Sequence, residues 1–189
     1  MDYSERFKCS LLPDEDDPRD YNQSNVLASY QEEIKIPSRV SFMDRVPKIQ
    51  NQLNIGACAH FAFARIAAIF DPWILFSPLY TYFFTRYREN AIINPDGTKI
   101  INVEEDTGST LRGTLKTANT YGWTLEELWK YTMANFPIEP SEAAKFYASN
   151  ELKTKRVVYY RVHSMDEIKF GMAMGYVPLM SMKITESFY

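Results

Sequence analysis

Cys58 and Gln52 are the side chains whose types and spacing could do chemistry. Gln52 lies six residues before Cys58, and Gly56 precedes the apolar run that contains the thiol. A thiol in the first turn of a helix feels the positive end of the helix dipole, and a nearby side-chain amide can donate to an oxyanion. Taken alone, a small thiol between Ala57 and Ala59 is more often a residue of a packed core. From the residues alone, both interpretations of Cys58 stay open.

A helix must position this thiol. Residues 56–76 form the most apolar stretch of the chain. His60 and Arg65 lie inside it and Asp71-Pro72 interrupt it after about 14 residues, whereas a membrane span needs roughly 20 apolar residues. We therefore predict a helix that begins near Gly56, is buried on all faces and does not span a membrane.

Caps and periodicity predict the remaining elements. Ser77-Pro78 indicate the start of a second helix, and residues 107–109 the start of a third that ends at Gly122. A polar turn is expected at residues 94–97. Further helices are expected at 124–131, 140–150 and 164–174, and strands at 157–162 and 177–184. This order predicts an α+β fold, with a helical lobe followed by an incomplete β-sheet lobe.

Composition limits the function classes. The 189 residues suit one domain, and a net charge of −3 disfavours a nucleic-acid partner. Cys9 and Cys58 cannot form a disulfide framework, which suits a reducing compartment, and we expect neither in an intramolecular disulfide. The first ten residues lack an apolar core, so we expect the protein not to be secreted. Nothing indicates a metal, a cofactor or a membrane partner.

The N-terminal region is strongly acidic. Residues 14–17 are four consecutive acids in a segment without helical or strand periodicity. We predict an acidic arm over residues 1–35, and solvation of its charges is favoured over an acidic binding motif. Residues 36–189 would then form the folded domain.

The segment QLNIGACA, residues 52–59, resembles the nucleophile segment of papain-like cysteine peptidases, particularly intracellular-type bacterial and large-DNA-virus members. The likeness extends over roughly residues 11–189. Its other landmarks, in family order, are 17–21, 47–52, 76–80, 106–112, 159–162 and 186–188. The resemblance implies a two-lobed papain-like fold, with a helical lobe at about 36–135, the start of a sheet lobe at about 155–189, and the C-terminal strands absent.

The same resemblance assigns roles to residues. Cys58 would be the nucleophile, and Gln52 with the Cys58 backbone N–H would form the oxyanion hole. Gly56, Gly108 and Ser109 would bind substrate; at Gly108-Ser109 a missing side chain lets an extended peptide backbone approach. This chain departs from the family at residue 53, where leucine replaces the usual glycine.

The catalytic base is the larger departure. The family places a His and an Asn roughly 130 to 150 residues beyond the nucleophile, but this chain ends at Tyr189 without those segments. His60 is two residues from Cys58, on the opposite side of the helix, and His163 lies where the family has no catalytic residue. We therefore expect this chain alone to be inactive as a peptidase.

Three interpretations remain. The favoured one is a cysteine peptidase acting on peptide or protein substrates, whose remaining strands were cleaved off or belong to another chain. The second is a catalytically inactive papain-fold protein with a structural or assembly role, for example in a viral particle beside a capsid or other protein. The third is an unrelated α+β protein with an accidental motif. The first two place the protein in the cytoplasm or a virion.

Overall fold

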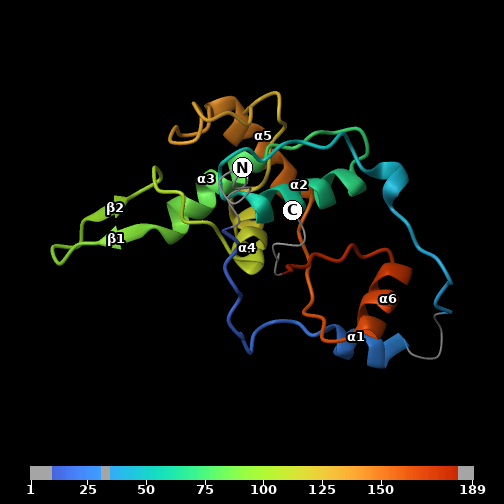
Figure 1. The fold of residues 1–189 in the computed structure, drawn as a ribbon. Helices are drawn as coiled ribbons and strands as arrows, with labels where there is room; N and C mark the ends of the chain where they lie inside the picture. Colours follow the sequence, from blue (N-terminus) through green and yellow to red (C-terminus); the bar gives the residue numbers. More distant parts are fainter. Residues whose placement is uncertain (1–9, 31–34, 183–189) are drawn as a thin grey trace, which may run out of the picture.

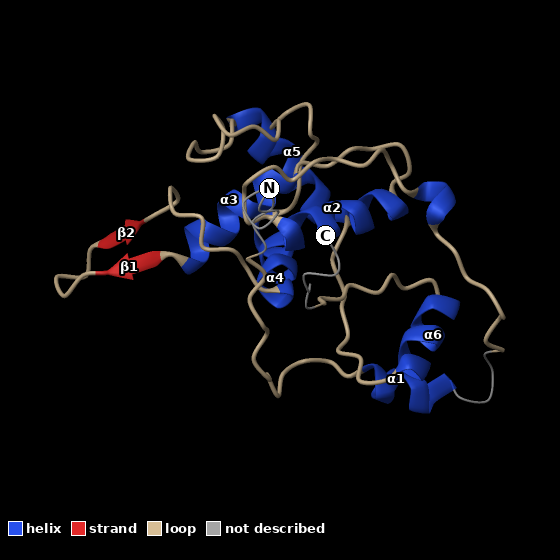
Figure 2. Ribbon diagram, viewed as in Figure 1, coloured by secondary structure: helices blue, strands red, loops and turns tan. Residues whose placement is uncertain are grey.

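The computed structural model describes residues 10–30 and 35–182. Figures 1 and 2 show an assembly of helices from which one β-hairpin projects. The α+β class is confirmed by this combination. In chain order the elements are α1 (Gln23–Tyr30), η2 (Met43–Arg45), α2 (Cys58–Phe70), α3 (Pro78–Glu89), β1 (Ala91–Ile93), β2 (Lys99–Ile101), α4 (Leu111–Tyr121), α5 (Glu142–Thr154) and α6 (Met165–Ala173).

Helix α3 is the centre of the core. Every residue from Pro78 to Arg86 is buried, and α3 contacts both α2 and α4. One apolar cluster joins α3 to α5 through Tyr80, Phe84 and Ala148, and a second joins α2 to α4. The sequence does not single out α3, because its buried positions include threonines, tyrosines and an arginine.

Helix α2 is less buried than its composition predicts. Ala59, Phe63 and Ala68 are buried, whereas Phe70 is 59% exposed and several intervening residues are half-buried. The expectation of burial on all faces is therefore wrong: α2 packs one side against α3 and α4 and leaves the other partly open. Within the described residues, no helix is long and apolar enough to cross a membrane.

Local capping signals place most helix starts. Ser77, Ser141 and Ser164 each accept a hydrogen bond from the backbone N–H three residues later, and Thr110 does the same for α4. The helix expected after Thr124 is absent. The expected capping box would pair Thr124 with Glu127, but Thr124 Oγ1 is buried with no hydrogen-bond partner among the described residues, and residues 126–128 form turns.

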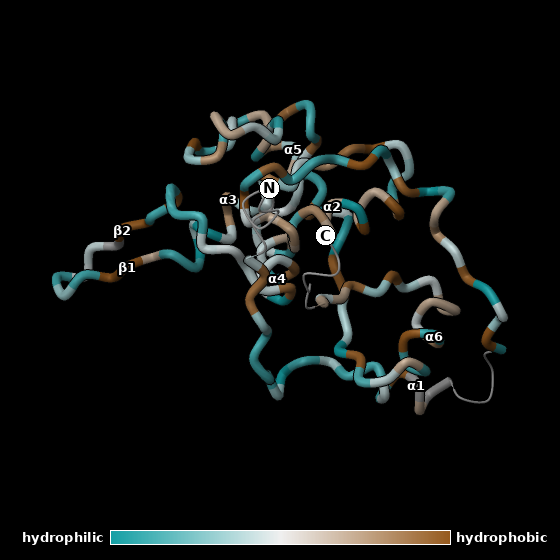
Figure 3. Tube along the Cα trace, in the orientation of Figure 1, coloured by the Kyte–Doolittle hydropathy of each residue, from teal (hydrophilic) through white to brown (hydrophobic). Residues whose placement is uncertain are grey.

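The strands differ from expectation. The polar turn at residues 94–97 closes an antiparallel hairpin of β1 and β2, which the sequence analysis missed. Residues 157–162 form no regular strand; Arg161 alone makes an isolated bridge, with Asn22. Residues 177–182 are irregular too, and 183–184 lie outside the described part. The hairpin exposes Ile92, Ile93 and Ile100, and Figure 3 shows both its strands as hydrophobic.

The acidic segment is solvated only in part: Glu15 and Asp16 are exposed, whereas Asp14 and Asp20 bond to Arg112. The Arg112 side chain pairs with Asp20, and the Arg112 backbone N–H donates to Asp14 at 3.1 Å. The Asp20 side chain is only 10% exposed. A carboxylate in the first turn of a helix compensates backbone N–H groups that lack intrahelical partners, so Asp14 stabilises the start of α4. After this segment, α1 packs against α6.

His60 is a core residue. It is 0% exposed, its Nδ1 lies 3.1 Å from Thr81 Oγ1, and its ring stacks at a tilt on Tyr82. Burial, with a smaller contribution from the nearby Arg86 and Arg88 charges, lowers the pKa of the imidazole to about 3. The ring is therefore neutral near pH 7, as expected of a histidine that serves packing.

This burial predicts an acid-dependent loss of stability. Below pH 6.5 the unfolded chain protonates His60 while the folded chain does not, so the free energy of unfolding falls as the pH falls toward 3. Between pH 6 and 4.5, wild type should lose about 2 kcal/mol more than His60→Gln in urea unfolding. Equal losses in the two proteins would contradict the buried neutral state.

Candidate functional site

Cys58 is the first residue of α2. The N-cap residue, Ala57, contributes no side-chain hydrogen bond, and its backbone N–H donates to the Ile55 carbonyl at 2.8 Å. Ile55 and Ala57 are buried against Tyr82, whereas Cys58 is half-buried and is a free cysteine. A thiol is thus held at the positive end of a 13-residue helix dipole. Cys9 lies outside the described residues.

Gln52 lies at the other end of the short loop that leads to Cys58. Its Nε2 donates to the Ile55 carbonyl at 2.7 Å, and the Tyr131 hydroxyl donates to the Gln52 carbonyl at 2.7 Å. Burial raises the pKa of the Tyr131 phenol, so it stays a donor. These bonds hold Gln52 at the loop that leads to the thiol.

Leu53 adopts a left-handed backbone conformation, with φ +54°. Its N–H donates to Asn51 Oδ1, which closes the turn. This is the position where the resemblance calls for glycine. The loop therefore keeps its tight turn despite the leucine, at a conformational cost of about 1 to 2 kcal/mol.

Gly56 and Gly108, fifty-two positions apart in the sequence, are tied together by two polar side chains. The Gly56 N–H donates to both carboxylate oxygens of Asp106, at 3.1 and 3.0 Å. The Tyr82 hydroxyl donates to Asp106, and the Gly108 N–H donates to that hydroxyl at 2.9 Å. Sequence reasoning missed Asp106 and Tyr82, since nothing in the local pattern marks hydrogen bonds between distant segments.

An extended segment of the chain lies along Gly108-Ser109. The Leu12 N–H donates to the Ser109 carbonyl at 3.0 Å, in a parallel bridge between Leu11 and Ser109. Ser10 sits so close to Gly108 that a Cβ there would lie 1.9 Å from the Ser10 carbonyl oxygen. This edge therefore accepts an extended backbone, and here that backbone belongs to the protein itself.

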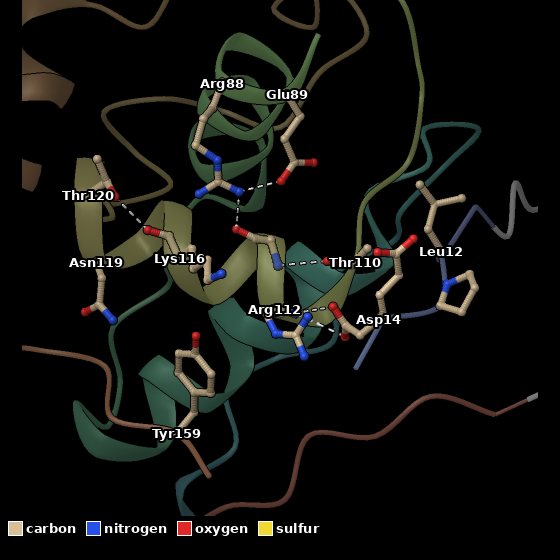
Figure 4. A pocket seen from close by; sticks show the side chains of 13 residues that line it. Leu12, Asp14, Arg88, Glu89, Thr110, Arg112, Lys116, Asn119, Thr120 and Tyr159 are labelled. Atoms are coloured by element: carbon tan, nitrogen blue, oxygen red, sulfur yellow. Dashed lines mark hydrogen bonds and ion pairs between the residues drawn. The ribbon is translucent and has the colours of Figure 1, made fainter. Parts of the chain in front are cut away.

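A pocket of about 770 Å³ lies beside α4, next to this segment (Figure 4). Its cationic side chains have partners: Arg112 pairs with Asp20, Lys116 lies 3.7 Å from Asp17, and Arg88 bonds to Glu89 and to the Gly113 carbonyl. No residue assigned to catalysis lines it. In the described part of the chain, no cluster of three His, Cys, Asp or Glu residues could hold a metal ion.

His163 does not resemble a catalytic base either. Its Nε2 lies 3.0 Å from Asn22 Oδ1, next to the bridge between Asn22 and Arg161, and its backbone N–H donates to Glu167. Together with the burial of His60, this leaves both histidines of the chain engaged in structural contacts.

Comparisons with known proteins agree with this geometry. No family model matches the chain. The fold is similar to that of xylellain, a cysteine protease from Xylella fastidiosa, with a TM-score of 0.61, 24% identity and coverage of 88% of this chain and 63% of that one. The helical assembly with Cys58 at the start of α2 is therefore a papain-like fold.

The sequence comparison points the same way. The chain is 27% identical over 169 residues to an uncharacterised peptidase C1-like protein of Acanthamoeba polyphaga mimivirus. The aligned region covers 82% of this chain and 48% of that protein. The resemblance to papain-like cysteine peptidases is thus confirmed in sequence and fold. The chain spans about half the length of this viral relative.

The conformation of Leu53 predicts an unusual order of stabilities. Leu53→Ala keeps a side chain at φ +54°, whereas Leu53→Gly removes the steric cost. Leu53→Gly should be more stable than Leu53→Ala by about 0.5 to 1 kcal/mol in urea unfolding. An alanine variant as stable as the glycine variant would show that this loop does not turn through the left-handed region.

The close approach of Ser10 predicts a severe effect of Gly108→Ala. Gly108 has φ +74°, and its Cβ would overlap the Ser10 carbonyl. Gly97, at the hairpin turn, has φ +82° but no atom within 4 Å of a Cβ, so Gly97→Ala carries the conformational cost alone. Gly108→Ala should be less stable than this control by about 1 to 3 kcal/mol, with faster amide exchange at Leu12. Equal losses would contradict the contact.

Proposed function

We propose that Cys58 is the nucleophile of a cysteine peptidase site that hydrolyses peptide bonds in peptide or protein substrates. The observation that carries the proposal is the half-buried thiol at the uncapped N-terminus of α2, next to the Gln52 loop. A helix N-terminus lowers the pKa of a thiol there and makes it more nucleophilic near pH 7. The similarity to papain-like peptidases supports the same assignment.

The other site residues take the roles that the resemblance implies. Gln52 and the Cys58 N–H would donate to the oxyanion, and Gly56, Gly108 and Ser109 would hold the substrate backbone. The pairing of Leu12 with Ser109 supports the last role, because it shows that the Ser109 carbonyl can accept from an extended strand.

We propose that the catalytic base lies outside residues 1–189. Its two histidines are His60, which is buried and neutral, and His163, which is bonded to Asn22. An imidazole that forms an ion pair with the thiolate and protonates the leaving amine would belong to a further segment or another chain.

The structural contacts of His60 and His163 favour a second candidate. A papain-fold protein without a base could serve as a structural or assembly component, and the viral relative makes a viral particle the setting to test. In either case we propose that the protein acts in the cytoplasm or in a virion.

Peptide hydrolysis at pH 7 separates these candidates. Residues 1–189 alone should cleave a fluorogenic peptide about 10²- to 10⁴-fold more slowly than the same chain joined to its His- and Asn-bearing segment. Cys58→Ala should abolish the activity of the longer protein, with Cys9→Ala as the matched control. Cys58-dependent hydrolysis by residues 1–189 would mean that His60 or His163 acts as base, and a longer protein without activity would favour the assembly role.

A further inference from the structure

Asp106 connects the two segments that meet at the candidate site. Its carboxylate accepts from the Gly56 N–H, two residues before Cys58, and from the Tyr82 hydroxyl. Tyr82 in turn accepts from the Gly108 N–H at 2.9 Å. One carboxylate and one phenol therefore fix the backbone on both sides of the site.

The two glycines enclose a single residue. A Cβ on Gly56 would lie 1.9 Å from Ser10 Oγ, and a Cβ on Gly108 would lie 1.9 Å from the Ser10 carbonyl oxygen. The extended segment at Ser10 thus fits a slot whose walls are Gly56 and Gly108. The width of this slot depends on the bonds through Asp106 and Tyr82, because both glycine N–H groups end on them.

Tyr82 is a rigid link. It is 0% exposed and packs against His60 and Phe136, with the Arg86 guanidinium 4.7 Å from the centre of its ring. Burial and the neighbouring Asp106 raise the pKa of the phenol, so the hydroxyl stays protonated. Since its proton goes to Asp106, its oxygen is the acceptor for Gly108. The hydrogen bonds therefore run in one direction, from the Gly108 N–H to Tyr82 and from Tyr82 to Asp106.

We propose that Asp106, acting through Tyr82, is a positioning residue that holds the Cys58 thiol at a fixed spacing from the peptide-pairing edge at Gly108-Ser109. The inference rests on the proposed function, because it gives a role to that spacing only if Cys58 attacks a peptide bound at the edge. A shift of either glycine would misalign the thiol with the carbonyl that it attacks.

Residues 10–12 occupy the edge, so the starting chain and wild type of this test is the 189-residue chain with Leu12→Pro, which removes the N–H that pairs with Ser109. Two alkylating reagents test the spacing in this chain. An N-blocked dipeptidyl chloromethyl ketone needs both the thiol and the edge to label Cys58 fast, whereas iodoacetamide needs only the thiol. The ratio of the two labelling rates at Cys58 therefore measures their alignment. Asp106→Ala should lower this ratio by about tenfold, the effect of losing one net hydrogen bond.

Two further variants separate positioning from general stability. Asp106→Asn keeps one oxygen that can accept from Gly56 and Tyr82 but replaces the second acceptor of the Gly56 N–H by a donor, so it should restore the ratio in part. Tyr82→Phe removes the bonds of the hydroxyl to Gly108 and to Asp106 but leaves the Asp106 carboxylate on the Gly56 N–H, so it should speed amide exchange at Gly108 more than at Gly56. Tyr82→Phe also tests the positioning role if Asp106→Ala does not fold. The matched control is Glu105→Gln, because Glu105 is exposed and bonds only to the Asn102 side chain.

Each outcome addresses one claim. A wild-type ratio that shows no preference for the peptidyl reagent would overturn the proposed function. A clear wild-type preference that survives Asp106→Ala, or unchanged Gly108 exchange in Tyr82→Phe, would overturn the positioning role alone. A ratio that falls in Asp106→Ala and recovers in part in Asp106→Asn supports it.

Discussion

The burial of Arg86 is the constraint on which the arrangement of this site depends. A guanidinium removed from water is costly unless its donors find acceptors. Arg86 donates to the carbonyls of Val103 and Phe136, and its guanidinium carbon lies 3.8 Å from the centre of the Phe136 ring. Burial lowers its pKa to about 10, so the side chain stays charged near pH 7. Since Val103 precedes Asp106 by three residues and Phe136 follows Tyr131 by five, the same bonds draw both residues toward the start of α2.

Around this cation the site is held by groups that keep their protonation state. Burial is the main cause that raises the pKa of both Tyr82 and Tyr131. Both phenols therefore remain donors, Tyr82 to Asp106 and Tyr131 to the Gln52 carbonyl. Such fixed donors preorganise the loop that leads to Cys58, and a preorganised site needs no rearrangement when charge develops in a reaction.

The sequence predicts what depends on neighbouring residues and misses what depends on distant ones. The start of α2, the Ser77 and Ser164 caps and the α+β class follow from local signals and were confirmed. The strand at residues 157–162 was predicted from its apolar, β-branched composition, yet the Val157 backbone bonds to the Asn119 side chain and Arg161 makes a single bridge, with Asn22. Of the candidate site, the Cys58 and Gln52 loop could be located, whereas Asp106 could not, because its partner Gly56 lies 50 residues away.

Departures from local rules gather at the same place. Four of the helices begin with a Ser or Thr that caps them, at residues 77, 110, 141 and 164, but α2 begins with Ala57 and no side-chain cap. Leu53, a few residues earlier, has a positive φ. A capping hydroxyl would satisfy the backbone donors that a thiolate or an oxyanion could use, so a structure selected only for stability would place one there. Local rules are broken where function requires it, and the uncapped start of α2 therefore favours a chemical role for Cys58 over a packing role.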